Sequence, residues 1–260
     1  MKDTDIMIKV YFTIDEIIKT IEIDKKPGPK GNLSDSEILT LMVLKPLLRP
    51  FKTLKSFHNW IKFNYLEYFP KMPDYTRIKR LFDNYRELII VIMQKLANLN
   101  SFGLIADGTT ISVMVGIRGK HAKSFRNARY VYCASKNDWS YGFILETIID
   151  QQGRISFANV GTEAEVKQLE NLLEDLKDKW VIADAGNIGG ELHERLWTDK
   201  QISINITGGK ERQWIENVFG FLKENLGIDH IRVRKMGSFL SRVYSILCGY
   251  NLKEELNLVI

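Results

Sequence analysis

Three acidic residues, Asp107, Asp184 and Glu216, have surroundings that could bring their carboxylates together. Asp107 and Asp184 each follow a short apolar run typical of a buried strand, 102–106 and 180–183. In sheets covered by helices, catalytic groups commonly lie at the carboxyl ends of strands. An acid in that place can also be only a turn or helix-cap residue. Taken as a set, however, such carboxylates could hold hard divalent cations through their oxygens.

Glu216 belongs to a segment, 209–223, whose apolar residues recur three and four positions apart and predict a helix. At about 100° per residue, Arg212, Glu216 and Lys223 fall within roughly 40° of one another on that helix. The resulting charged stripe is either an exposed ladder of ion pairs or a carboxylate flanked by cations that face an anionic substrate. The two upstream aspartates favour the second interpretation.

Two metal ions about 3.5–4 Å apart can activate a nucleophile and stabilise the leaving oxygen of a phosphodiester. Other chemistries lack their motifs: no His/Cys cluster suggests zinc, no phosphate-binding glycine loop is present, and the glycines at 186–190 do not form a dinucleotide fingerprint. Metal-dependent phosphoryl transfer, with Mg²⁺ or Mn²⁺ and two ions, is the interpretation that fits the acids.

The composition is that of a globular protein with a net positive charge. The chain has 260 residues, 45% of them hydrophobic and 27% charged, which is ordinary for a globular protein with a real core. A formal net charge of +5 and a pI of about 9.0 favour polyanionic partners. Cys133 and Cys248 make no metal-ligand or disulfide pattern. No apolar run reaches the length of a membrane span, so we expect a cytoplasmic protein without a membrane partner.

Residues 1–99 are expected to form a helical N-terminal domain, with helices over 5–23, 35–45 and 75–98. Ser34 and Glu37 form a capping box that opens the second helix, and Pro46 and Pro50 are expected to end it. Between Glu37 and Glu67 the chain has several lysines and one arginine but no acid, a weak indication of phosphate contacts.

Residues 100–260 are expected to form an α/β catalytic domain, since the pattern changes at residue 100. The helices expected there are 163–176, 190–197 and the helix around Glu216. Strands are expected over 102–107, 110–117, 129–134, 141–150, 154–160, 180–184 and 201–206. Strands followed by alternating helix and strand predict a mixed sheet flanked by helices.

Two basic segments are candidate nucleic-acid contacts. The densest, between Asp107 and the next strand, has no acid and contains Arg118, Lys120, His121, Lys123, Arg126 and Arg129. A solvated loop is the simpler interpretation of such a run, but its place near the carboxylates favours contacts to DNA phosphates. The second segment contains Arg232 and Arg234.

Several motifs together carry a resemblance to a known family. They are 33–40, 69–77, Tyr141-Gly142-Phe143, 181–192, Arg232-Val233-Arg234 and 239–252, with Arg212-x3-Glu216-x6-Lys223 around the glutamate. Across most of its length the chain resembles the DDE transposases of bacterial and archaeal insertion sequences, and it is most similar to the IS nine-eight-two family.

This resemblance implies a ribonuclease-H-like catalytic core with a mixed five-stranded sheet. It implies that Asp107, Asp184 and Glu216 are the metal ligands, and that Arg212 and Lys223 contact DNA phosphates. It also implies double-stranded DNA partners, namely the terminal inverted repeats of an element and its target, bound by a homodimer. The activity implied is DNA strand cleavage followed by strand transfer.

Two departures from the family pattern motivate alternatives. Gly209 stands where the glutamate signature usually begins with a tyrosine, and only 32 residues separate Asp184 from Glu216. A degenerate transposase that binds DNA without cutting it is therefore the second hypothesis. A stand-alone nuclease of the same fold, which would make no strand-transfer product, is the third.

Overall fold

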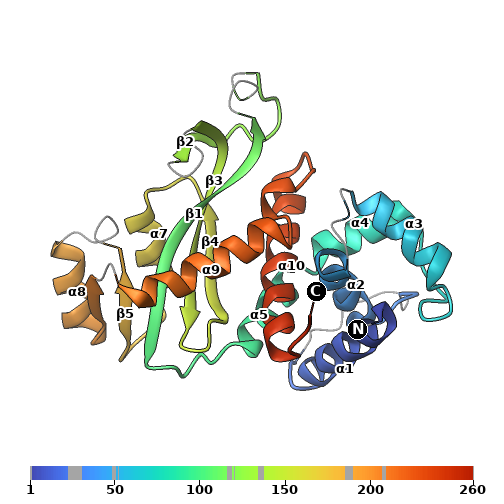
Figure 1. The fold of residues 1–260 in the computed structure, drawn as a ribbon, viewed down its shortest axis with the longest axis horizontal. Coiled ribbons are helices and arrows are strands. Elements are labelled where there is room, and N and C mark those ends of the chain that lie inside the picture. The colour runs from blue at the N-terminus through green and yellow to red at the C-terminus, as the bar shows by residue number, and fades with distance from the viewer. Residues whose placement is uncertain are drawn as a thin grey trace. The chain divides into compact units, whose positions relative to one another are not determined.

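The computed structural model describes residues 2–22, 31–48, 51, 53–115, 119, 121–133, 138–184, 190–206 and 209–259. Arg118 and Lys120, both predicted to contact DNA, lie outside these residues. The chain divides into two compact units (Figure 1). One comprises Met1–Leu96, Asn225–Gly227 and Ile231–Ile260, and the other Ala97–Glu224 and Ile228–His230. None of the described helices is long and apolar enough to cross a membrane.

The first unit is helical. Its helices are α1 (Asp3–Lys19), α2 (Asp35–Leu48), α3 (Leu54–Asn64), α4 (Tyr75–Asn84), α5 (Arg86–Leu96) and α10 (Met236–Glu255). The predicted capping box opens α2: the Ser34 hydroxyl accepts from the Glu37 backbone N–H at 3.2 Å, and a Glu37 carboxylate oxygen accepts from the Ser34 N–H at 2.6 Å. The expected end at Pro46 is wrong, because α2 continues to Leu48 with Pro46 inside it.

The position of the helix α10 differs most from what the sequence predicts. The sequence prediction placed 231–260 with the catalytic domain, whereas the contacts place this segment in the helical unit. Nearly every residue from Ser238 to Leu252 is buried, so this helix needs neighbours on all sides. The Ser241 hydroxyl donates to the Phe82 carbonyl at 2.6 Å, and the Asn251 amide donates to the Met93 carbonyl at 2.9 Å. The last helix is thus the centre of the helical bundle.

The second unit is a mixed sheet flanked by helices. Its strands are β1 (Gly103–Val115), β2 (Arg129–Cys133), β3 (Asp138–Asp150), β4 (Ile155–Gly161), β5 (Trp180–Ala183) and β6 (Ser203–Ile206). Its helical segments are α7 (Glu165–Leu172), α8 (Gly190–Lys200), α9 (Lys210–Glu224) and the short 3₁₀ helix η3 (Ile228–His230). Within the described residues the sheet has six strands, in the order β2-β3-β1-β5-β6, with β4 also paired to β3.

The strand directions give the fold class. β1, β3 and β4 pair antiparallel, whereas β5 pairs parallel to β1 and β6 parallel to β5. α8 lies in the crossover from β5 to β6, the kind of connection that a parallel pair usually has. Three antiparallel strands followed by two parallel ones form the ribonuclease-H-like sheet, so the predicted α/β class is confirmed. The sixth strand, β2, lies beside the first half of β3.

One strand differs from the prediction in a way that affects the site. Residues 102–107 and 110–117 were expected to be separate strands, but β1 runs unbroken from Gly103 to Val115. Gly108-Thr109 has the composition of a turn, yet both residues pair with β3, Gly108 with Glu146 and Thr109 with Leu145. The long partner strand therefore overrides the local turn signal.

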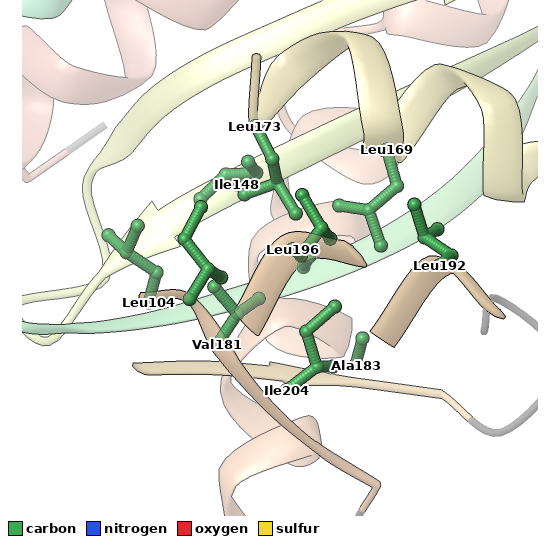
Figure 2. Close-up of a cluster of buried hydrophobic side chains, with 11 residues drawn as sticks. Leu104, Ile148, Leu169, Leu173, Val181, Ala183, Leu192, Leu196 and Ile204 are labelled. Atoms are coloured by element: carbon green, nitrogen blue, oxygen red, sulfur yellow. The ribbon is translucent and has the colours of Figure 1, made fainter. Parts of the chain in front are cut away.

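The two faces of the sheet are covered by different helices (Figure 1). α7 and α8 pack on one face over an apolar cluster (Figure 2), which contains Leu104, Ala106, Ile148, Leu169, Leu173, Val181, Ala183, Leu192, Leu196, Ile202 and Ile204. Because strand side chains alternate between faces, Leu104 and Ala106 point toward this core and Asp107 does not. The opposite face of β1 is covered by α9, whose residues contact Asp107 and Thr109.

Candidate active site

Three elements of the sheet unit present the predicted carboxylates. Asp107 lies within β1, opposite Thr147 of β3, and not at the end of a strand as expected. Asp184 directly follows the last residue of β5, as predicted. Glu216 lies in the second turn of α9, whose buried residues Ile215, Val218, Phe219 and Leu222 turn the helix toward the sheet. Trp214, an apolar residue of the same helix, is half exposed.

Arg212 joins the three carboxylates. Its Nη1 lies 3.0 Å from Asp184 Oδ2, and its Nε lies 3.5 Å from Glu216 Oε1 and 3.8 Å from Asp107 Oδ2. The predicted charged stripe is therefore real between Arg212 and Glu216, which form an i,i+4 ion pair. The guanidinium contacts two further acids that local spacing could not show.

Lys223 approaches the same part of β1 from the other end of α9. Its Nζ donates to the Thr109 hydroxyl at 2.6 Å. Eleven residues separate Arg212 from Lys223, about 16 Å along a helix, whereas Asp107 and Thr109 are about 7 Å apart along a strand. The two long cationic side chains therefore converge from opposite ends of α9 on one short stretch of β1.

The carboxylates differ in their access to solvent. The Asp107 side chain is 12% exposed, that of Asp184 38% and that of Glu216 57%. Asp107 Oδ1 accepts from the Gly108 N–H at 2.9 Å. Burial raises the pKa of Asp107 to about 6, although the Gly108 hydrogen bond and the Arg212 charge both act to lower it. Asp184 and Glu165 add to the rise, so desolvation together with like charge outweighs the guanidinium.

The donor set suits a hard divalent cation, because all three side chains offer carboxylate oxygens and no softer ligand. In the described part of the chain, however, no three His, Cys, Asp or Glu side chains lie close enough to hold one ion. The guanidinium of Arg212 explains this spacing, since it stands among the carboxylates at ion-pair distances. The acids fit a cation in their chemistry, and the cation they contact is Arg212.

A second acidic pair lies beside the site and was not predicted. Glu146 of β3 is fully buried, and neither of its carboxylate oxygens has a hydrogen-bond partner among the described residues. A Cβ placed on Gly108 would lie 2.7 Å from a Glu146 oxygen and 3.1 Å from an oxygen of Glu165 in α7. Burial raises the pKa of Glu146 to about 8, with further contributions from Glu165 and Asp107.

Strand alternation places Glu146 on the α7 face of the sheet, away from Arg212. The sequence signal that could have linked the two acids is Gly108, which lies directly opposite Glu146. Because glycine has no side chain, it leaves space on this face of β1 for the carboxylates of Glu146 and Glu165.

The predicted DNA-contacting residues are mostly on the surface. His121, Lys123, Arg126 and Arg129 are exposed in the sheet unit, and an Arg129 guanidinium N–H donates to the Glu163 carbonyl at 3.2 Å. Arg232 and Arg234 are exposed in the helical unit. Arg212 and Lys223 are only half-buried and are already engaged by groups of the protein.

Comparison with protein families identifies one match, over part of the chain. Residues 96–208 match a family model described as "Transposase DDE domain". The matched segment begins at the boundary of the sheet unit, contains Asp107 and Asp184, and ends before Glu216. It spans less than half of the chain. A comparison with curated proteins found no match.

Two solved structures are similar to the chain at 11% sequence identity. They are a pre-cleavage Mos1 transpososome, with a TM-score of 0.26 over 92% of this chain and 83% of that one, and a Mos1 mariner paired end complex with Mn, with a TM-score of 0.23 over 89% and 83%. Overlap this low supports no structural argument, so the fold assignment rests on the strand order itself.

Proposed function

We propose that this chain is a DNA transposase that cuts and joins DNA strands by metal-dependent phosphoryl transfer. The observation that carries the proposal is the convergence of Asp107, Asp184 and Glu216 on one cationic group, from two neighbouring strands and a helix. The match of residues 96–208 to a transposase DDE family model supports it, because that segment contains both aspartates. Of such transposases, the sequence motifs favour the IS nine-eight-two family.

In this proposal Asp107, Asp184 and Glu216 hold Mg²⁺ or Mn²⁺, as two ions. When bound, such ions activate the attacking oxygen and stabilise the leaving oxygen of an in-line displacement. The position of Asp107 inside a 13-residue strand, paired to β3, fixes its backbone more firmly than a loop would. Glu216, on a helix and half exposed, is the ligand that can adjust.

The cations of α9 supply the contacts to the substrate. Lys223 places an ammonium two residues along β1 from Asp107, where a DNA phosphate bound at the carboxylates would lie. Arg212 is the second cation of this surface. His121, Lys123, Arg126 and Arg129, with Arg118 and Lys120 of the same run, would contact the DNA backbone, and so would Arg232 and Arg234 of the helical unit.

The reaction has two displacements at phosphorus. Water attacks a phosphodiester at the end of the element, breaking the bond to the 3′ oxygen and leaving a 3′-hydroxyl and a 5′-phosphate. The 3′-hydroxyl then attacks a target phosphodiester, forming a new bond and releasing a target 3′-hydroxyl. The partners are the terminal inverted repeats and target DNA, with residues 1–99 contributing to repeat binding and a homodimer pairing two ends.

The test uses a supercoiled plasmid that carries the DNA flanking this gene, incubated with the full chain and Mg²⁺. Nicked and joined products are expected. Asp107→Asn should lower their rate about a thousandfold, because it removes a ligand from ions that contribute several kcal/mol. Asp199→Asn, an exposed acid at the end of α8, is the matched control and should retain the rate. Unchanged cleavage by Asp107→Asn would show that the carboxylate assignment is wrong.

One observation favours a second candidate, a degenerate transposase that binds DNA without cutting it. Arg212 contacts the three carboxylates where a metal ion would be required. The same plasmid separates the candidates. Salt-sensitive DNA binding with no product in either Mg²⁺ or Mn²⁺ would support the degenerate protein, and cleavage without any joined product would support a stand-alone nuclease.

A further inference from the structure

We propose that Arg212 is an internal competitor for the metal site: without a bound metal its guanidinium occupies the space among the three carboxylates, and it must withdraw before a divalent cation can bind there. This inference rests on the proposed function, because it assumes that these carboxylates are the metal ligands. It assigns Arg212 a role in setting the metal affinity, in addition to any contact with DNA.

The first argument is geometric. Mg²⁺ holds its oxygen ligands at about 2.0–2.1 Å, so oxygens that share an ion lie close together. In this structure Arg212 Nε is 3.5 Å from Glu216 and 3.8 Å from Asp107, while Nη1 is 3.0 Å from Asp184. The carboxylates are thus spaced around a guanidinium and must move inward around an ion. A side chain and an ion cannot occupy this volume together.

The second argument is electrostatic. Three carboxylates and one guanidinium leave the cluster with a net negative charge, which attracts a cation. A divalent ion that entered beside Arg212 would nevertheless meet a positive charge at a few ångströms, a distance shorter than the screening length of physiological salt. Withdrawal of Arg212 removes this repulsion and exposes all three acids at once.

The third argument concerns how firmly Arg212 is held. Its Nε is buried and has no hydrogen-bond partner among the described residues, although two carboxylates lie within ion-pair distance. The Arg212 side chain is 35% exposed, and ion pairs with this much solvent access are individually weak. Arg212 therefore stabilises the metal-free site without closing it permanently, as an exchangeable occupant should.

Binding of Mn²⁺ to the full chain, measured by isothermal titration calorimetry without DNA, tests the inference. Arg212→Gln removes the competing charge and should bind Mn²⁺ about tenfold more tightly than the unmodified protein, the size expected for a few weak ion pairs. Arg195→Gln is the matched control: Arg195 pairs with Glu170 on the outer side of α7 and α8 and should leave the affinity unchanged. Equal or weaker binding by Arg212→Gln would overturn the inference.

The possible failures can be told apart. If neither protein binds Mn²⁺, the carboxylates are not a metal site and the proposed function fails together with the inference. If both bind with the same affinity, only the inference fails. A measurement on the unmodified chain does not depend on a variant that folds: the Arg212 Nε–H resonance, followed by NMR during Mg²⁺ titration, should shift along the binding curve. A resonance that does not move while Mg²⁺ binds would overturn the inference.

Discussion

Buried carboxylates on the two faces of the central sheet have different surroundings. On the α9 face, Asp107 lies with two other acids around Arg212, and Glu216 is open to solvent. On the α7 face, Glu146 is fully buried beside Glu165, and its oxygens have no hydrogen-bond partner within the described structure. Both acids have a raised pKa, Asp107 to about 6 and Glu146 to about 8.

A nearby cation distinguishes the two acids. Burial is the largest cause of the raised pKa in both acids, but only for Asp107 do a guanidinium and a backbone N–H oppose it. At neutral pH Asp107 is therefore mostly ionised and available to bind a cation, whereas Glu146 is mostly protonated. One face of the sheet holds an ionised carboxylate beside a guanidinium, and the other holds a neutral carboxyl at the end of an apolar core.

The apolar core itself gives the largest expected effect. Leu169→Ala should lower the free energy of unfolding by about 3 kcal/mol, because Leu169 is fully buried between α7 and the sheet and a cavity would remain. Urea denaturation measures the change. Leu172→Ala, three residues further along α7 and only partly buried, is the control and should cost less than half as much. Equal losses would show that the α7 face is not packed as described.

Glu146→Gln tests the protonation of that face. Burial raises the pKa of Glu146 from its ordinary value of about 4.5 to about 8, so its stabilising contribution is complete below about pH 4.5 and is lost as the pH rises through 8. The unmodified protein should therefore lose stability between pH 5 and 8.5, and the variant should be more stable by a few kcal/mol at pH 8.5, since a change of one pKa unit corresponds to about 1.4 kcal/mol.

The measurement is urea denaturation of both proteins at pH 5 and pH 8.5. At pH 5 the two should be nearly equal, because a protonated carboxyl and an amide are both neutral. Glu174→Gln, an exposed acid beyond the end of α7, should follow the unmodified protein at both values. A parallel decline of Glu146→Gln and the unmodified protein would show that Glu146 does not titrate in this range.

Local patterns predicted much of this architecture. The capping box at Ser34 and Glu37 needs only four residues, and it is present as expected. The apolar run before Asp184 is a strand because its composition suits a buried strand in any context. The placement of Arg212 and Glu216 on one face follows from helical spacing alone. Each of these features depends on residues that are close together in the sequence.

Features that depend on distant partners were missed. Gly108 is typical of a turn, and only its pairing with Glu146, 38 residues away, keeps β1 continuous. The burial of Glu146 likewise requires β4 and α7 to be in place. The position of α10 in the helical unit could not be inferred, since its apolar residues would suit either unit. The roles of the three carboxylates and of the cations near them stay predictions.

Gly108→Ala would place a methyl group against Glu146 on the α7 face of the sheet. Its new Cβ would lie 2.7 Å from a Glu146 oxygen, and the fully buried Glu146 side chain has little room to withdraw. We expect a loss of about 1–2 kcal/mol in the free energy of unfolding. Gly220→Ala on α9, where an added Cβ meets nothing within 4 Å, should instead be stabilising by about 0.5–1 kcal/mol. Thermal unfolding of both variants measures the contrast, and a stabilising Gly108→Ala would contradict the close approach of Glu146.

The smallest effect should come from the polar contacts of the α9 face. Lys223→Met removes the hydrogen bond to the Thr109 hydroxyl, and Thr109→Val removes its acceptor. Each should cost about 0.5–1 kcal/mol in the free energy of unfolding, since Lys223 is only half-buried. In a double-mutant cycle the two losses should not add, with a coupling of about 0.5 kcal/mol or more. If the two losses were fully additive, the hydrogen bond between the Lys223 ammonium and the Thr109 hydroxyl would contribute nothing to stability. A measurable coupling would mean that β1 positions the Lys223 ammonium two residues from Asp107.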